Sequence, residues 1–341
     1  MKIIITGVAG FIGSQLCYEL LKDGYNIVGI DNLLCGYMEN MNLFIKHNNF
    51  KFYNISVNDP NIDNLIEKND IVIHLASISS LASNQENPSF SYQNNVTQML
   101  YLLEVCRNIG VKHFIFSSTS AVYENNTKFP LTENDQIKPN LIYSLEKKHC
   151  EELIESFNQV YGLQYSILRF FNVYGPNQDS QRLHPALVPY LLKCIINKET
   201  PILHSDGYQQ RDYVFIDDII SLFKILISNQ PLNDLINLSS GSVISVQEIV
   251  NILNSFNEFN DYQLKPIYRN PELLWEKSTK LWQGEFTFSK YRMKQEVEKY
   301  TIGDNSKAYK LLGWKPKIDM VNGLKKCFDL INSDIKKCVN N

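Results

Sequence analysis

The residues best suited to chemistry are a tyrosine and a lysine four positions apart, Tyr143 and Lys147. Apolar residues at helical spacing follow them, through Leu153 and Ile154, so both side chains are predicted to lie on one face of a helix. An ammonium group beside a phenol stabilises the phenolate and lowers the pKa of the phenol, which would suit Tyr143 to act as a general base. Surface residues often show the same spacing, so the elements that position this pair must decide its role.

The composition indicates an ordinary globular protein. The chain has 341 residues, is 44% hydrophobic and 20% charged, and carries a formal net charge of -3. This slightly acidic balance does not favour nucleic acid as a partner. The chain has no apolar run of membrane-spanning length, and the run at 3–5 leads into glycines rather than a signal peptide. Seven cysteines without a CxxC pair predict reduced thiols in a cytoplasmic protein and no metal site.

A glycine turn near the N-terminus predicts a site for a dinucleotide. Residues 2–6 form a β-branched run typical of a buried strand, and leucines at helical spacing follow the turn. Between them stand Gly7, Gly10 and Gly13. In such a turn the first glycine permits the sharp bend, the second lets the backbone approach a pyrophosphate, and the third lets helix and strand pack closely.

The residue that ends the second predicted strand indicates which dinucleotide is bound. This strand covers 26–30 and leads into Asp31, 18 residues after Gly13. A carboxylate at that position can accept hydrogen bonds from the adenosine ribose hydroxyls and would repel the 2′-phosphate of NADP. The combination of turn and carboxylate therefore predicts NAD as the cofactor.

Alternating strands and helices continue after Asp31. Strands are predicted at 50–55, 70–76 and 112–116, with a helix at 95–109 between the last two. The strand at 112–116 runs into four hydroxyl residues, 117–120. These hydroxyls either satisfy backbone groups of a loop or, at the carboxyl edge of a parallel sheet, face a substrate.

Together these motifs resemble the extended short-chain dehydrogenase/reductase family, in its branch of NAD-dependent nucleotide-sugar epimerases and dehydratases, and most of all the UDP-hexose 4-epimerases. The resemblance covers nearly the whole chain. It is carried by GVAGFIGS at 7–14, DNL at 31–33, HLA at 74–76, FSSTSAVY at 116–123, YSLEK at 143–147, RFFNVYGP at 169–176, RDYVFIDD at 211–218, INLSSG at 236–241 and KLLGWKPK at 310–317.

The resemblance implies an α/β fold, a Rossmann-like doubly wound parallel sheet with a smaller α/β C-terminal domain for the substrate. The NAD-binding domain is expected at 1–171, with 206–235 returning to it, and the substrate domain at 172–205 and 236–341. The resemblance also implies a homodimer. Its interface would use the apolar face around Met99 and Leu103 with the helix at 143–157, unless these faces belong to the intramolecular core.

The resemblance further implies roles for individual residues. Thr119 would bond the sugar O4, Tyr143 would be the base, and Lys147 its partner. The positions that would bind NAD are Gly7, Gly10, Phe11, Ile12, Gly13, Asp31, Asn32, Asn54, Ile55, Leu75, Ala76, Asn95, Ser117, Tyr143, Lys147 and Phe171. The positions that would bind the sugar nucleotide, a UDP-sugar above all, are Thr119, Asn172 at the pyrophosphate, Val188 at the base, Arg211 at a phosphate, and Arg292.

The chain departs from the family pattern at several places. Asn54 replaces an aspartate that contacts adenine, although an amide can still form that hydrogen bond. Glu124 replaces a glycine. The family's late Arg-Pro-Gly segment is not intact, and 269–300 forms a polar and aromatic insertion instead. Within it, Arg292 either takes the role of the missing second phosphate arginine or is an exposed residue.

The residues after Thr119 indicate which reaction is catalysed. The 4,6-dehydratase branch has Asp-Glu there, for proton transfer at C5 and C6, whereas this chain has Ser120 and Ala121. Without an acid, elimination has no evident catalyst, and Glu124 is the only nearby candidate. The sequence therefore predicts a 4-epimerase that acts through a transient 4-keto sugar.

Other reactions and another class of function stay open. A 4,6-dehydratase, a C2-epimerase and a 4-keto reductase share the fold, and the sugar and the nucleotide are not determined. A non-catalytic NAD-binding sensor is disfavoured because Tyr143 and Lys147 are both present.

Overall fold

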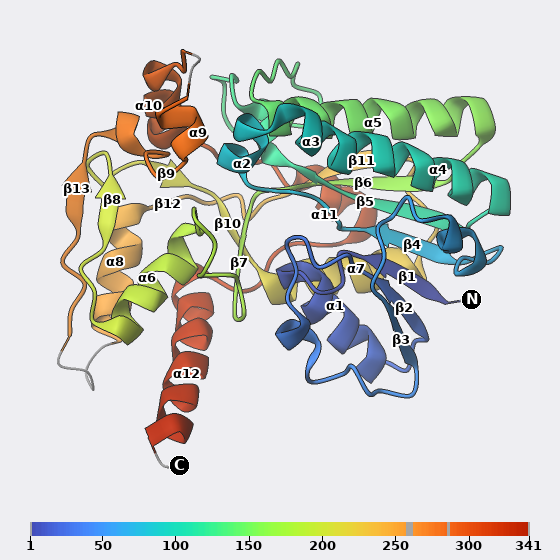
Figure 1. Cartoon of the computed structure of the whole chain (residues 1–341), viewed down its shortest axis with the longest axis horizontal. Helices are drawn as coiled ribbons and strands as arrows, with labels where there is room; N and C mark the ends of the chain where they lie inside the picture. The colour runs from blue at the N-terminus through green and yellow to red at the C-terminus, as the bar shows by residue number, and fades with distance from the viewer. Residues whose placement is uncertain (1, 257–261, 285–286, 340–341) are drawn as a thin grey trace.

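A seven-stranded parallel sheet forms the centre of the protein. The computed structural model describes residues 2–256, 262–284 and 287–339 (Figure 1). The strand order is β11-β6-β5-β4-β1-β2-β3, and every neighbouring pair is parallel. The chain thus winds outward from β1 to β3 and then in the opposite direction from β4, which confirms the predicted doubly wound fold. The strands are β1 (Ile3–Thr6), β2 (Ile27–Ile30), β3 (Phe50–Tyr53), β4 (Ile71–His74), β5 (His113–Thr119), β6 (Tyr165–Phe170) and β11 (Asp234–Leu238).

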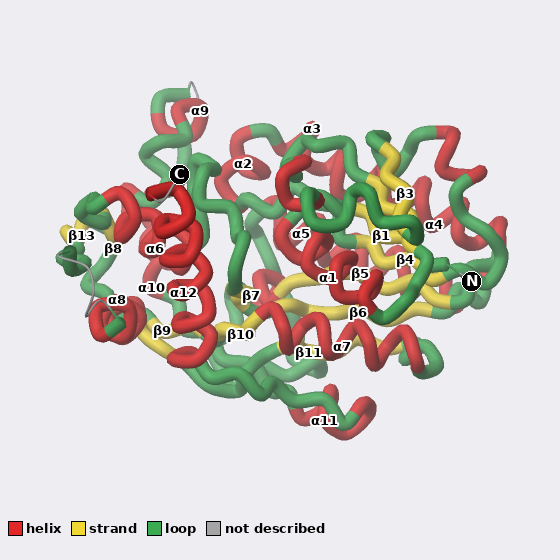
Figure 2. The backbone as a smooth tube through the Cα atoms, turned by 90° about the horizontal axis from the view of Figure 1, so that it is seen from below, coloured by secondary structure: helices red, strands yellow, loops and turns green. Residues whose placement is uncertain are grey.

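Helices cover both faces of this sheet because its central strands are apolar on both sides. In β1, Ile3 and Ile5 point to one face and Ile4 to the other, and all three are fully buried. The first face packs against α1 (Phe11–Lys22) and α7 (Ile216–Ser228). The second packs against α4 (Gln98–Ile109) and α5 (Ile142–Tyr161). Figure 1 shows these layers, and in Figure 2 the strands lie side by side in the right half of the view.

The predicted helix at 95–109 is not a continuous α-helix. Its first residues belong to a π turn over Gln93–Thr97, which continues into α4. Two short helices, α2 (Leu81–Glu86) and α3 (Pro88–Tyr92), precede this turn. π turns often occur at functional sites. The predicted strands also differ at their ends, since β3 ends at Tyr53, β4 at His74, and β5 extends to Thr119.

The apolar face of α4 faces inward. Met99 and Leu103 are fully buried and pack with Cys150 and Ile154 of α5. They therefore belong to the intramolecular core and do not supply the dimer interface that was one interpretation of the sequence.

The remaining elements gather at the other end of the molecule (Figure 1). Three small sheets pair β7 (Asn172–Tyr174) with β10 (Tyr213–Phe215), β9 (Gln210–Arg211) with β12 (Ile244–Ser245), and β8 (Ile202–His204) with β13 (Ile267–Arg269). The helices here are α6 (Leu187–Asn197), α8 (Val246–Ser255) and α12 (Met320–Val339), whereas α11 (Ser306–Leu312) lies against β11 of the large sheet. The domain division stays a prediction, with one adjustment: β11 keeps the chain in the large sheet up to Leu238, so the last predicted segment begins after that residue.

The insertion at 269–300 packs against the start of α5. It contains η5 (Pro271–Leu273), α9 (Thr279–Trp282) and α10 (Lys290–Glu298). Its buried side chains Trp275, Leu281 and Met293 form one apolar cluster with Ala82 of α2 and with Leu141. Across the described ranges of the chain, no helix combines the length and the apolarity that crossing a membrane requires.

Candidate active site

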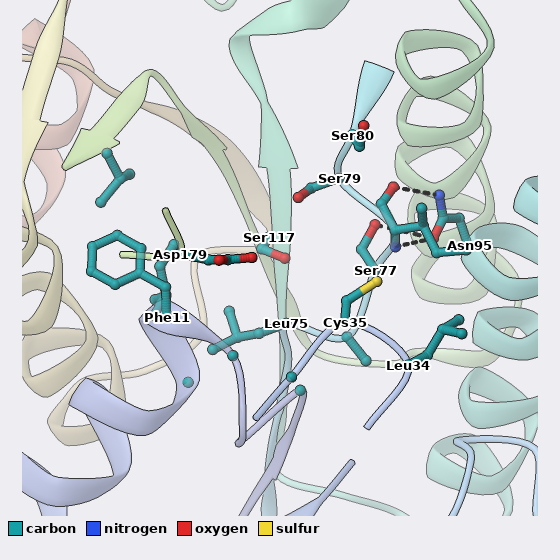
Figure 3. Close-up of a pocket in the computed structure, with 18 of the residues that line it drawn as sticks. Phe11, Leu34, Cys35, Leu75, Ser77, Ser79, Ser80, Asn95, Ser117 and Asp179 are labelled. Carbon is teal, nitrogen blue, oxygen red and sulfur yellow. Dashed lines mark hydrogen bonds between the residues drawn. The ribbon is translucent and has the colours of Figure 1, made fainter. Parts of the chain in front are cut away.

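A cavity of about 650 Å³ opens at the carboxyl ends of the parallel strands, where open α/β sheets bind their ligands. The structure brings most of the predicted site residues to its wall, and Figure 3 shows part of it. The predicted residues that line it are Gly7, Gly10, Phe11, Ile12, Gly13, Asp31, Asn32, Ile55, Leu75, Ala76, Asn95, Ser117, Thr119, Tyr143, Lys147, Phe171, Asn172 and Val188.

The glycine turn forms one end of the cavity. Gly7 has φ +73°, in the left-handed region, and its carbonyl accepts a hydrogen bond from the N–H of Gly10 (3.1 Å). A Cβ on Gly13 would lie 2.2 Å from the Gly7 oxygen, so only glycine allows this packing. The helix α1 begins at Phe11 without a side-chain cap, which leaves the N–H groups of its first turn for an anion. The turn therefore fits the diphosphate of a dinucleotide.

Asp31 is held at the end of β2 by the same turn. Its Oδ2 accepts the N–H of Ala9 (3.0 Å), and its Oδ1 accepts the N–H of Leu33 (2.8 Å). Burial raises the pKa of Asp31, while these two N–H groups lower it. Each carboxylate oxygen has a further lone pair, so the fixed carboxylate can also accept ribose hydroxyls.

Asn95 fixes the loop that follows β4. Its Oδ1 accepts the N–H of Ile78 (2.8 Å) and the hydroxyl of Ser77 (3.1 Å), as Figure 3 shows. Its Nδ2 donates to Glu146 Oε2 (2.7 Å) and to the carbonyl of Ile78 (3.1 Å). Asn95 is 3% exposed, so it shapes the wall of the cavity by holding this loop.

The three predicted catalytic residues meet in this cavity. Thr119 is the last residue of β5, and Tyr143 is the second residue of α5. The hydroxyl of Thr119 lies near the phenol of Tyr143 and favours the ionised form of the phenol. One turn further along α5, Lys147 Nζ donates to the carbonyl of Ser117 (2.8 Å). A sugar hydroxyl beside Thr119 would thus lie against the phenol.

The electrostatics of Tyr143 differ from the expectation. Burial is the largest influence and raises the pKa of the phenol, and the nearby hydroxyl of Thr119 opposes it. The ammonium group of Lys147 bonds the carbonyl of Ser117 and lies 5.8 Å from the centre of the Tyr143 ring, and burial outweighs the groups that lower the pKa of the phenol. Burial also lowers the pKa of Lys147 to about 8. The position of the two residues on one helix face is therefore as expected, and the pKa of the phenol is not.

Three predicted site residues lie outside the cavity wall. Asn54 is exposed on the loop after β3, although its neighbour Ile55 lines the cavity. Arg211 donates through Nη2 to the carbonyls of Glu296 (3.0 Å) and Val297 (2.8 Å) at the end of α10.

Arg292 does not line the cavity and is not an exposed residue. It forms ion pairs with Glu124 and Glu296, and its side chain is 14% exposed. The sequence shows the residue types, but it does not show that these guanidinium groups bond groups of the same chain that lie far away in sequence.

Some residues of the cavity wall were not predicted from the sequence. Tyr37, after β2, donates its hydroxyl to Asp179 Oδ2 (3.2 Å), after β7. These two residues and Arg182 line the cavity. They fall outside the recognised motifs, and no local signal indicates that the two loops meet.

The chain is also similar to known proteins over almost its whole length. Residues 4–327 match the family described as GDP-mannose 4,6 dehydratase. The chain belongs to this family. Its resemblance to the extended short-chain dehydrogenases/reductases is thereby confirmed.

Individual proteins are similar to this chain in sequence or in structure. The UDP-glucuronate 4-epimerase of Thermodesulfobacterium geofontis is 33% identical over 98% of this chain and 97% of its own. The structure of UDP-glucose 4-epimerase from Thermotoga maritima with UDP-glucose superposes with a TM-score of 0.84, at 30% identity, covering 98% and 100% of the two chains. The UDP-glucuronic acid 4-epimerase of Bacillus cereus, in complex with UDP-glucuronic acid and NAD, has a TM-score of 0.81 at 26% identity, covering 98% and 99%.

Proposed function

We propose that this protein is an NAD-dependent UDP-sugar 4-epimerase that acts on a UDP-hexose or UDP-N-acetylhexosamine through a transient 4-keto sugar. The observation that carries this proposal is that Thr119, Tyr143 and Lys147 meet in one cavity, whose described wall has no acid beside them. Among the described residues, Asp31 and Asp179 are the acidic ones that line the cavity. Asp31 accepts the N–H groups of Ala9, in the glycine turn, and of Leu33, and Asp179 accepts the Tyr37 hydroxyl.

The placement of Glu124 weakens the dehydratase alternative. This residue was the nearby acid that could have assisted elimination. Its carboxylate accepts hydrogen bonds from the backbone of Asn140 and Leu141, from Ser144 and from Arg292, and it does not line the cavity. Elimination across C5 and C6 therefore has no acid among the described residues of the cavity wall near Thr119.

The residues that would hold NAD are those of the predicted cofactor set that line the cavity. The glycine turn and the start of α1 suit the diphosphate, and Asp31 suits the adenosine ribose. NAD, when bound, supplies reversible hydride acceptance at the sugar C4. Tyr143 would take the proton of the C4 hydroxyl and return it, and Thr119 would orient that hydroxyl. Lys147 holds the carbonyl of Ser117 beside them.

The sugar nucleotide would extend from Thr119 toward the other end of the molecule. Asn172 and Val188 line the cavity there and suit the roles of pyrophosphate and base contacts. Asn172 Nδ2 donates to the carbonyl of Asp212 (2.8 Å), which fixes the amide. Arg211 would have to exchange its carbonyl partners at 296 and 297 to reach a phosphate.

The deciding experiment is product analysis with a panel of UDP-, dTDP- and GDP-sugars. We expect a product of unchanged mass whose NMR couplings show inversion at C4. A product lighter by one water would establish a dehydratase, and inversion at C2 would move the chemistry to another carbon. If no sugar alters the redox state of bound NAD, the non-catalytic sensor becomes the better description.

We also propose that the protein is a cytoplasmic homodimer that serves carbohydrate biosynthesis. The cysteines of the described side chains, at 17, 35, 106, 150, 194 and 327, are free, which suits a reducing compartment. Apolar side chains remain exposed beside α5, including Phe90 at 54% and Tyr161 at 53%. Sedimentation analysis would test the dimer, and a monomer at micromolar concentration would contradict it.

A further inference from the structure

An ion pair joins the insertion at 269–300 to the start of the helix that carries Tyr143. Arg292, in the first turn of α10, donates through Nη2 to Glu124 Oε2 (2.9 Å). The side chain of Glu124 is 1% exposed. Neither residue lines the cavity, so neither is placed to touch a ligand. Both belong to places where this chain departs from its family's pattern.

Glu124 acts as a cap for α5 supplied from outside the helix. The residue that precedes the helix, Leu141, has no side chain that can accept a hydrogen bond. Glu124 Oε1 accepts the N–H groups of Asn140 and Leu141, the latter at 2.9 Å. Its Oε2 accepts the hydroxyl of Ser144 (3.2 Å). A carboxylate bonded to these terminal groups stabilises the first turn of a helix. These contacts lie on both sides of Tyr143 in the chain.

Glu124 also lies in the same chain segment as Thr119. Thr119 Oγ1 accepts the N–H of Ala121 (3.1 Å) and so begins the short helix η4 (Ser120–Tyr123). Glu124 follows directly after η4. It therefore connects the segment that presents the Thr119 hydroxyl with the turn that presents the Tyr143 phenol.

Further hydrogen bonds fix the position of the Arg292 side chain. Its Nε donates to Asn140 Oδ1 (3.3 Å), and its Nη1 donates to Glu296 Oε2 (3.4 Å). The next residue, Met293, is fully buried in the apolar cluster that includes Leu141. Removing one partner of such a buried pair leaves the other charge uncompensated, so the pair acts as a unit.

We propose that Glu124 and Arg292 are positioning residues for catalysis. Their ion pair fixes the first turn of α5 and so aligns the Tyr143 phenol with the Thr119 hydroxyl and the sugar hydroxyl between them. This inference rests on the proposed epimerase function. It assigns the insertion at 269–300 to the alignment of the general base, and not to phosphate binding.

Steady-state kinetics of Arg292→Met and Glu124→Gln test the inference. A displacement of the phenol by a fraction of an ångström predicts a fall in kcat of about 10- to 100-fold, with KM changed by less than about 3-fold. Arg292→Lys should recover part of kcat. The double variant should be no slower than the slower single variant, because the two residues act through one contact. Lys294→Met, on an exposed position of the same helix, is the matched control and should keep full activity.

Three results would overturn the inference. A raised KM with an unchanged kcat would show that Arg292 serves substrate binding, and additive losses in the double variant would show two independent effects. Hydrogen exchange at 141–146 supplies a readout that does not need turnover. It should become faster in Arg292→Met than in Lys294→Met at equal NAD content, and equal exchange would also refute the inference. If the unmodified protein epimerises no sugar, the proposed function fails, and hydrogen exchange still decides whether the pair fixes this turn. If Arg292→Met does not fold, Arg292→Lys and Glu124→Gln carry the test.

Discussion

Replacing Lys147 by methionine removes a buried ammonium group but keeps a side chain of similar length. Lys147 is 3% exposed, and burial lowers its pKa from 10.5 to about 8. A tenfold change in an acid dissociation constant corresponds to about 1.4 kcal/mol, so lowering this pKa from 10.5 to about 8 corresponds to about 3 kcal/mol. The folded protein is less stable by about this amount while the group is protonated in both states.

The sign of the pH dependence follows from that shift. Below pH 8 the lysine is protonated in the folded and the unfolded states, so burying its ammonium group lowers the stability of the folded protein by the full amount. Between pH 8 and 10.5 the unfolded chain keeps the proton and the folded protein releases it. The unfolded state then binds more protons, so the stability of the unmodified protein rises with pH. Relative to it, Lys147→Met should lose about 3 kcal/mol between pH 7 and the upper end of this range.

Urea unfolding of the nucleotide-free proteins at a series of pH values measures this change. The hydrogen bond lost to Ser117 and the packing of the methionine shift the difference equally at every pH, so they cancel from the change. The matched control is Lys148→Met, the next residue, whose ammonium group is partly exposed and pairs with Glu152 at 3.5 Å. The difference in unfolding free energy between Lys148→Met and the unmodified protein should be nearly the same at every pH. If the difference in unfolding free energy between Lys147→Met and the unmodified protein is also the same at every pH, the reasoning from burial is refuted.

Three further outcomes are expected. Tyr143→Phe should reduce turnover by at least ~10²-fold while calorimetry finds sugar-nucleotide binding nearly intact, and normal turnover would remove the phenol from the mechanism. Asp31→Ala should weaken the preference for NAD over NADP in binding titrations, and equal affinities in the unmodified protein would contradict the role of this carboxylate. Gly13→Ala should lower the thermal midpoint and NAD affinity together, because its Cβ would lie 2.2 Å from the Gly7 oxygen, whereas Gly24→Ala meets no atom within 4 Å and should leave NAD affinity unchanged.

The sequence by itself determined the features that depend on neighbours along the chain. The apolar pattern of β1, the glycine turn and Asp31 at the end of β2 are contiguous signals, and the fold bears out their arrangement. The shared helix face of Tyr143 and Lys147 follows in the same way from a spacing of four residues.

Tertiary structure alone decided what depends on distant partners. The sequence could not show that Met99 and Leu103 are buried in the core, nor that burial raises the pKa of Tyr143. The ion pair of Arg292 with Glu124 joins residues 168 positions apart. Such contacts, and the loss of water around a charge, arise only when separate elements pack together, so no local pattern in the chain encodes them.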